Sequence, residues 1–205
     1  MAKLDILTYP NPILREVSEP VTEFGPELKK FADNLLETMY DASGIGLAAV
    51  QVGRLHRMLA VDTRPKDEKS GRYTYDEQSE LENKVQQPLI LINPEIVKGE
   101  GKITFDEGCL SVPSFFETVE RFEKIEVKAF DVNGKEFRFT TDGLLAICIQ
   151  HEMDHLEGTL FIDHISFTKS NRIKNQIKKS GYPTKEEIEE KRNNLRNKSK
   201  EPSRA

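Results

Sequence analysis

The sequence has only two cysteines, Cys109 and Cys148, and it has no long apolar run. In a reducing compartment two cysteines rarely form a structural disulfide, so each is open to a role as core thiol, nucleophile or metal ligand. The longest apolar run, residues 144–149 (LLAICI), is far shorter than the ~20 residues that a membrane helix needs. The first ten residues lack the apolar stretch and cleavage site of a secretory signal. We therefore expect a cytoplasmic protein with no membrane partner.

Charge is distributed unevenly along the 205 residues, although the net charge is only −5. Residues 166–205 contain twelve Lys/Arg and five Asp/Glu, a balance of +7, which leaves −12 for the remainder. We therefore divide the chain into a main domain, residues 1–165, and a basic helical tail, residues 166–205. Within the tail, Thr184 and Glu187 match a capping box that would open a last short helix.

Hydrophobic periodicity predicts an α+β fold. Apolar spacing indicates an amphipathic helix at 27–41 and a second helix at 142–158, with Asp142 as N-cap and Gly158 at its end. Alternating or apolar runs predict strands, and Asn133-Gly134 predicts a hairpin turn; the strand segments are 57–62, 88–97 and the two halves of 124–141. Residues 63–87 are polar and read as an exposed insertion. We expect mixed, mostly antiparallel sheets packed around the 142–158 helix.

The strongest chemical signal is the segment His151-Glu152-Met153-Asp154-His155. Imidazoles at i and i+4 share one helix face and can hold one ion, with the intervening Glu beside a metal-bound water. Two core histidines next to a surface Glu are the structural alternative. Catalytic sites of this kind usually have three protein ligands, so a third is needed.

Several residues compete for the role of third ligand. The position six residues after His155 is Phe161, which excludes one known pattern, while Asp163 and His164 remain possible. Upstream, Cys109 follows Gly108 on a segment that leads into Pro113, which suits a thiolate presented from extended backbone. Cys148 shares the face of the two histidines, but its isoleucine neighbours indicate a core or pocket-lining thiol.

Three segments together resemble the peptide deformylase family. They are residues 44–51 (GIGLAAVQ), 107–111 (EGCLS) and 151–155 (HEMDH), in the family's order and at compatible separations. The resemblance spans residues 3–170. It implies removal of the N-formyl group from the formyl-methionine of nascent polypeptides, with release of formate. It also implies one divalent metal per chain, with Fe²⁺ favoured and Zn²⁺, Ni²⁺ or Co²⁺ as possible substitutes.

The resemblance assigns roles residue by residue. The metal ligands would be Cys109, His151 and His155, and Glu152 would be the general acid and base. The side-chain amide of Gln51 and the backbone N–H of Leu110 would bind the oxyanion. Backbone groups of Ile45 and Gly46 would pair with an extended peptide, and the methionine pocket would be lined by Leu144, Ile147 and Cys148. Glu107 and Arg121 would brace the site, and Phe116 replaces an Arg found in some bacterial members.

Two other function classes remain open from the residues alone. A metalloprotease would use His151, Glu152 and His155 on internal peptide bonds, and a non-catalytic metal or RNA-binding module would not need Glu152 at all. The basic tail fits either a ribosome partner through phosphate attraction or a solvated charge run, and we expect no DNA partner.

Overall fold

The computed structural model describes residues 3–64 and 78–184 of the chain. In chain order the helices and strands are η1 (Pro12–Arg15), α1 (Pro26–Asp41), β1 (Gly46–Ala48), η2 (Ala49–Val52), β2 (Met58–Val61), α2 (Glu80–Lys84), β3 (Leu89–Glu100), β4 (Ile103–Cys109), β5 (Val112–Arg121), β6 (Lys124–Phe130), β7 (Glu136–Asp142), α3 (Gly143–Leu156), η4 (Phe161–Asp163) and α4 (Phe167–Ser180). The helix predicted to open at Thr184 falls beyond the described residues.

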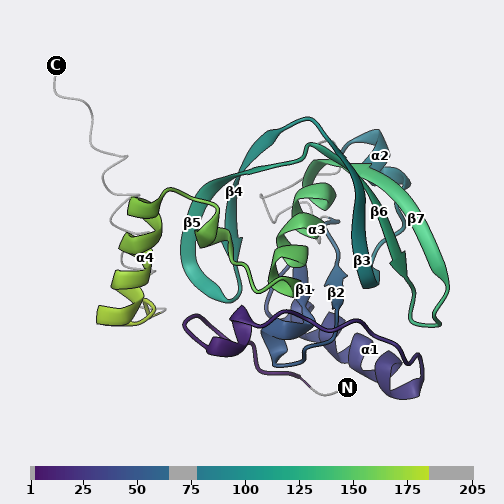
Figure 1. The fold of residues 1–205 in the computed structure, drawn as a ribbon, viewed down its shortest axis with the longest axis horizontal. Coiled ribbons are helices and arrows are strands. Elements are labelled where there is room, and N and C mark those ends of the chain that lie inside the picture. Colours follow the sequence, from purple (N-terminus) through teal and green to yellow (C-terminus); the bar gives the residue numbers. More distant parts are fainter. Residues whose placement is uncertain (1–2, 65–77, 185–205) are drawn as a thin grey trace.

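The strands form two antiparallel sheets. One has five strands in the order β1-β2-β3-β6-β7, and the other is the long hairpin β4–β5. The strands of the described residues all pair antiparallel, and Glu19 and His56 form an isolated parallel bridge. In Figure 1, α3 runs between the β4–β5 hairpin and strands β3, β6 and β7, with α1 below. The predicted α+β class is confirmed.

Residues that alternate along β1 and β2 pack on opposite faces of the five-stranded sheet, as a period of two requires. One set joins the core cluster that contains Leu145 and Ile149 of α3, and the other joins Leu35 and Met39 of α1. The first set is Ala48, Leu59 and Val61, and the second is Leu47, Met58 and Ala60. The sheet is thus covered by α3 on one face and by α1 on the other.

The predicted hairpin turn at Asn133-Gly134 is confirmed. Gly134 has a φ of +79°, and its N–H donates to the Asp131 carbonyl over 3.0 Å. Only glycine takes this left-handed conformation without steric cost, so the turn joins β6 to β7 in register.

The prediction that residues 63–87 are exposed was wrong for three of the residues that the structure describes there. Residues 80–84 form helix α2, and Thr63, Glu82 and Gln87 are buried. Polar composition indicated exposure to solvent, but these three side chains are buried because hydrogen bonds to one another and to the backbone hold them inside the fold. Residues 65–77 of the predicted insertion are outside the described part.

The first part of the tail forms α4, which packs against the main domain through Ile173 and Ile177. These side chains share a cluster with Val112 of β5 and Phe161 of η4. Figure 1 shows α4 on the outer side of β5. The division into two domains at residue 165 stays a prediction. None of the helices described is long and apolar enough to cross a membrane.

Candidate metal centre and active site

Helix α3 carries His151, Glu152 and His155, which are nearly fully buried. The four-residue spacing places both imidazoles on one helix face, with ring centroids 5.1 Å apart. The nitrogen atoms of the two rings therefore face the same space between α3 and the β4–β5 hairpin.

Cys109 ends β4 and reaches the same space. The register of the hairpin shifts between Gly108 and Cys109, and such an irregularity re-aims a side chain. Its Sγ lies 3.2 Å from Nε2 of His155. Cys109, His151 and His155 offer donor atoms that all lie within 4.8 Å of one another.

The other candidates for the third ligand have different partners. The Cys148 thiol contacts the Ile45 carbonyl at 3.5 Å, and Asp163 pairs with Arg15 and Lys174. Nε2 of His164 lies 2.7 Å from Asp154. Across residues 3–64 and 78–184, the cysteine and the two helix histidines are the one group with metal-ligand spacing.

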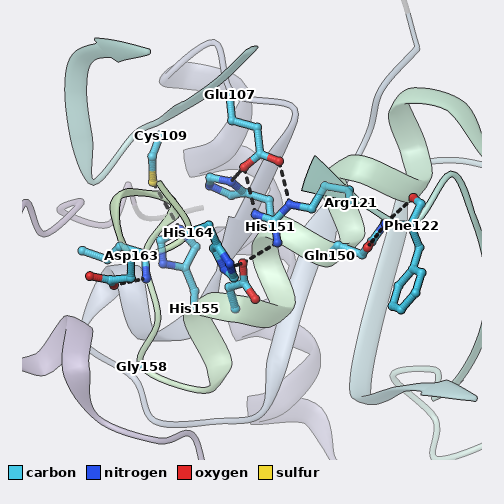
Figure 2. A network of polar contacts seen from close by, with 12 residues as sticks. Glu107, Cys109, Arg121, Phe122, Gln150, His151, His155, Gly158, Asp163 and His164 are labelled. Carbon is cyan, nitrogen blue, oxygen red and sulfur yellow. Dashed lines mark hydrogen bonds and ion pairs between the residues drawn. The ribbon is translucent and has the colours of Figure 1, made fainter. Parts of the chain in front are cut away.

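A buried ion pair orients the first histidine. Glu107 accepts hydrogen bonds from Nε and Nη2 of Arg121 over 2.7 and 2.9 Å, and its Oε2 lies 2.8 Å from Nδ1 of His151. Figure 2 shows Glu107 and Arg121 beside the His151 ring, with Cys109 facing His155. The remaining arm of Arg121 donates to Asp154 over 2.6 Å. Nε2 of His151 is therefore the nitrogen left to face the centre, as in metal sites whose histidines are braced by carboxylates.

The electrostatics of the site separate its ionisable groups. Burial alone would raise the pKa of Glu107, but Arg121 and His151 outweigh it and lower this pKa to about 2. Burial raises the pKa of Glu152 to about 7, although the neighbouring His151 opposes it. Burial and the charge of His151 lower the pKa of His155, which keeps that ring neutral. A carboxyl with a pKa near neutrality is suited to taking and returning a proton.

The side chain of Gln51 has a fixed orientation. Its Oε1 accepts a hydrogen bond from the Ala48 N–H over 2.7 Å, so its amide nitrogen points the other way. That nitrogen lies 3.1 Å from Oγ of Ser111 and 3.8 Å from Sγ of Cys109. Leu110 lies in the turn directly after Cys109. An amide N–H donor thus lies beside the centre.

Strand β1 is an edge strand, and its backbone groups divide between two directions. The Ile45 carbonyl accepts from the Asp62 N–H over 2.8 Å, so it is already engaged inside the fold. Because backbone groups alternate along an antiparallel strand, those of Gly46 point toward the open edge. A Cβ on Gly46 would come within 2.4 Å of Oε1 of Glu152 and 2.7 Å of Sγ of Cys148. The edge therefore offers Gly46 for pairing, while the carbonyl of Ile45 has an internal partner.

Comparison with known proteins identifies the family. A family model described as polypeptide deformylase matches residues 3–171. The chain belongs to this family. Deformylases are metal-dependent hydrolases that remove the N-formyl group from nascent peptides.

Individual deformylases match over most of their length. The chain is 46% identical to the peptide deformylase of Alkalilimnicola ehrlichii over 87% of this chain and 91% of that one, and 48% identical to that of Cellvibrio japonicus over 87% and 96%. Among solved structures, a deformylase from Legionella pneumophila matches at 35% identity and a TM-score of 0.73, covering 98% of this chain and 100% of that one. A deformylase from Ehrlichia chaffeensis in complex with actinonin matches at 37% identity and a TM-score of 0.75, over 88% and 99%.

For three residues around the site, the sequence did not indicate the contacts that the structure shows. Ser111 contacts the Gln51 amide, Asp154 holds Arg121, and His164 contacts Asp154. Asp154 lies inside the motif and could have been suspected from its place between the histidines. Ser111 also lies inside a quoted motif, and His164 was weighed only as a metal ligand; the contacts that the structure gives them could not be foreseen, since Gln51 is distant in sequence from Ser111 and His164 lies beyond the motif that holds Asp154.

Proposed function

We propose that this deformylase holds one divalent cation with Cys109, His151 and His155 and uses Glu152 to move the proton. The observation that carries the proposal is the convergence of three donor atoms from β4 and α3 beside a buried carboxyl with a pKa near 7. One sulfur and two imidazoles suit borderline-soft divalent ions. With bonds of about 2.0–2.3 Å, such an ion could lie between three donor atoms that are within 4.8 Å of one another. The cation would supply Lewis-acid polarisation of the formyl carbonyl and would lower the pKa of water.

The proton steps are assigned to Glu152. Within the described residues its Oε2 is buried with no hydrogen-bond partner, so it has capacity for the attacking water. Glu152 takes a proton from this water as the oxygen adds to the formyl carbon. It then returns a proton to the amine nitrogen as the C–N bond breaks, and formate leaves.

Gln51 and Leu110 are proposed as the oxyanion donors. The fixed amide of Gln51 and the backbone N–H of Leu110 would hold the oxygen of the tetrahedral species. A donor of this kind is typically worth about 2.7–4 kcal/mol. The Gln51 orientation supports the assignment because Ala48 fixes which end of the amide faces the centre.

The peptide behind the formyl group is proposed to add to the open edge of β1. Gly46 offers backbone groups there, and strand addition supplies affinity that does not depend on sequence. Leu144, Ile147 and Cys148, on the first turns of α3, would line the pocket for the methionine side chain. The close fit of the Gly46 backbone against Glu152 and Cys148 supports this placement, because it sets the edge of β1 directly beside the acid/base and the proposed pocket.

We further propose Fe²⁺ as the native ion, which the resemblance favours, with Zn²⁺, Co²⁺ or Ni²⁺ as substitutes. An iron–thiolate centre would lose activity in air as Cys109 is oxidised. Elemental analysis after anaerobic purification decides the identity: iron supports the proposal, and zinc with air-stable activity contradicts it.

One assay separates the proposed function from its rivals. Formate release from a formyl-Met peptide, measured beside cleavage of casein, distinguishes a deformylase from a metalloprotease. Glu152→Gln should keep its metal and lose turnover, whereas a non-catalytic metal-binding module would release no formate in either form. Casein cleavage without formate release would overturn the proposal.

The ribosome remains a proposed partner of residues 166–205, and a cytoplasmic location remains a prediction. Within α4, Lys169 and Arg172 pair with Glu117, which reduces the charge that these two offer to RNA phosphates. Lys178 and Lys179, in the last turn, are the cations of α4 that we assign to such a contact. Salt-sensitive co-sedimentation with ribosomes that is lost in a double alanine variant of these lysines would support the assignment.

A further inference from the structure

The first turn of α3 is capped by a residue outside that helix. Asp142 occupies the N-cap position, but its side chain makes no capping hydrogen bond. It contacts Oγ of Ser79 instead. The prediction that Asp142 caps the helix was therefore wrong for its side chain, and the exposed N–H groups of the first turn need another acceptor.

Glu82 of α2 supplies that acceptor. Its Oε1 accepts from the Leu145 N–H over 3.1 Å and from the Thr63 hydroxyl over 2.8 Å, and the residue is fully buried. A carboxylate at a helix N-terminus is stabilised by the positive end of the helix dipole. The contact joins residues that are 63 positions apart in sequence.

The two helix starts are interlocked. Ser79 caps α2 by accepting from the Glu82 N–H over 3.0 Å, and the same hydroxyl contacts Asp142. Thr63, which donates its hydroxyl to Glu82, is itself held in place because its N–H donates over 2.8 Å to Oε1 of Gln87. The short helix α2 is therefore held between the end of β2 and the start of α3.

We propose that Glu82 is a positioning residue that sets the first turn of α3 and thereby the selectivity of the methionine pocket. This inference rests on the proposed function, in which Leu144, Ile147 and Cys148 line that pocket. Leu144 directly precedes the residue whose N–H is capped. The catalytic group Glu152 lies two turns further on, where hydrogen bonds within the helix hold the backbone.

Because the capped turn lies at the proposed methionine pocket, we expect its loss to change which formyl peptide is preferred and not the rate of turnover. Glu82→Ala should reduce the preference for formyl-Met-Ala-Ser over formyl-Leu-Ala-Ser, measured as the ratio of kcat/KM values, by about fivefold, as for a lost cap worth ~1 kcal/mol. The change should appear in KM for the methionine peptide, with kcat close to that of the parent.

Two further variants separate positioning from stability. Asp131→Ala is the control, because it removes a carboxylate that caps backbone N–H groups elsewhere: Asp131 accepts from two of them in the β6–β7 turn, whereas Glu82 accepts from the Leu145 N–H and the Thr63 hydroxyl. It should leave the ratio unchanged at a similar loss of thermal stability. Ser79→Ala, a milder change that removes the cap of α2, should shift the ratio in the same direction as Glu82→Ala.

Hydrogen exchange of the metal-loaded protein gives the second readout. The Leu145 amide should exchange at least about fivefold faster in Glu82→Ala, and at the parent rate in Asp131→Ala, since a cap worth ~1 kcal/mol is lost at one site only. An unchanged peptide ratio, or an unchanged Leu145 exchange rate, overturns the proposal. If the parent protein itself releases no formate, the proposed function is refuted. The exchange comparison would still decide whether Glu82 holds the first turn of α3.

Discussion

Glu107 Oε2 lies 2.8 Å from Nδ1 of His151, and the same carboxylate accepts two hydrogen bonds from Arg121. Glu107 comes from β4, two residues before Cys109, whereas His151 comes from α3. The strand that presents the sulfur therefore also fixes the ring of a second ligand. This shared support makes the geometry of the centre depend on how the hairpin packs against the helix.

Glu107→Gln should weaken metal binding. The amide cannot keep both the Arg121 ion pair and the His151 contact, and the loss of such a brace typically costs about 10–100-fold in metal affinity or activity. Dialysis against a graded chelator, followed by elemental analysis, measures the change. Asp106→Asn is the control, because Asp106 is an exposed neighbour of Glu107 that accepts a hydrogen bond from the Thr118 hydroxyl over 2.6 Å. Equal metal retention in the two variants would refute the role of Glu107.

Gly46→Ala should abolish formate release. Its Cβ would lie 2.4 Å from Oε1 of Glu152 and 2.7 Å from Sγ of Cys148, so the edge of β1 and the acid/base must separate. We expect a loss of at least about 100-fold, comparable to misplacing a catalytic group by 1 Å. Gly25→Ala is the control, since no atom lies within 4 Å of its added Cβ. Parent-like activity in Gly46→Ala would show that the edge is not part of the site.

The sequence predicted those parts of the site that reside in contiguous motifs. The 151–155 spacing placed both histidines on one helix face, and Gly108 with Pro113 indicated the extended segment that presents Cys109. Local residues could not reveal what lies across the fold. The engagement of the Ile45 carbonyl by Asp62, and the capping of α3 by Glu82, depend on strand pairing and on packing between distant segments.

Ile173→Ala in α4 should destabilise the protein by about 2–5 kcal/mol, the usual cost of emptying a buried aliphatic site. Ile173 is 2% exposed and belongs to the cluster that contains Val112 and Phe161. Urea unfolding of the metal-loaded protein measures the difference. Lys178→Ala on the same helix should stay within about 0.5 kcal/mol of the parent, as surface changes do. A similar small effect for Ile173→Ala would show that α4 does not pack as described.

The contribution of Asp163 to stability should depend on pH. Burial alone would raise the pKa of Asp163, but Arg15, the Leu160 N–H and Lys174 lower it below its ordinary value of 3.8. The folded state therefore favours the ionised carboxylate. Its stabilisation is fully present above pH 3.8 and is lost as the pH falls through the folded-state pKa.

Asp163→Asn tests this sign. The variant should be less stable than the parent near neutral pH, and the difference should shrink toward zero as the pH falls below about 4. Urea unfolding at a series of pH values gives both curves. A difference that grows on acidification would contradict the assignment.

Polar segments were the least predictable part of the fold. The composition of 63–87 indicated solvent exposure, yet Glu82 is fully buried because helix α3 offers it an N–H and Thr63 a hydroxyl. The burial of a charged residue depends on its partners, and these come from other segments of the chain.

The metal content of two cysteine variants shows which sulfur binds the ion. After anaerobic purification, Cys109→Ala should lose stoichiometric metal, while Cys148→Ala should keep one divalent ion per chain. We expect this difference because only the Cys109 sulfur lies with the two imidazoles. Full occupancy in Cys109→Ala, or loss of the ion in Cys148→Ala, would contradict it.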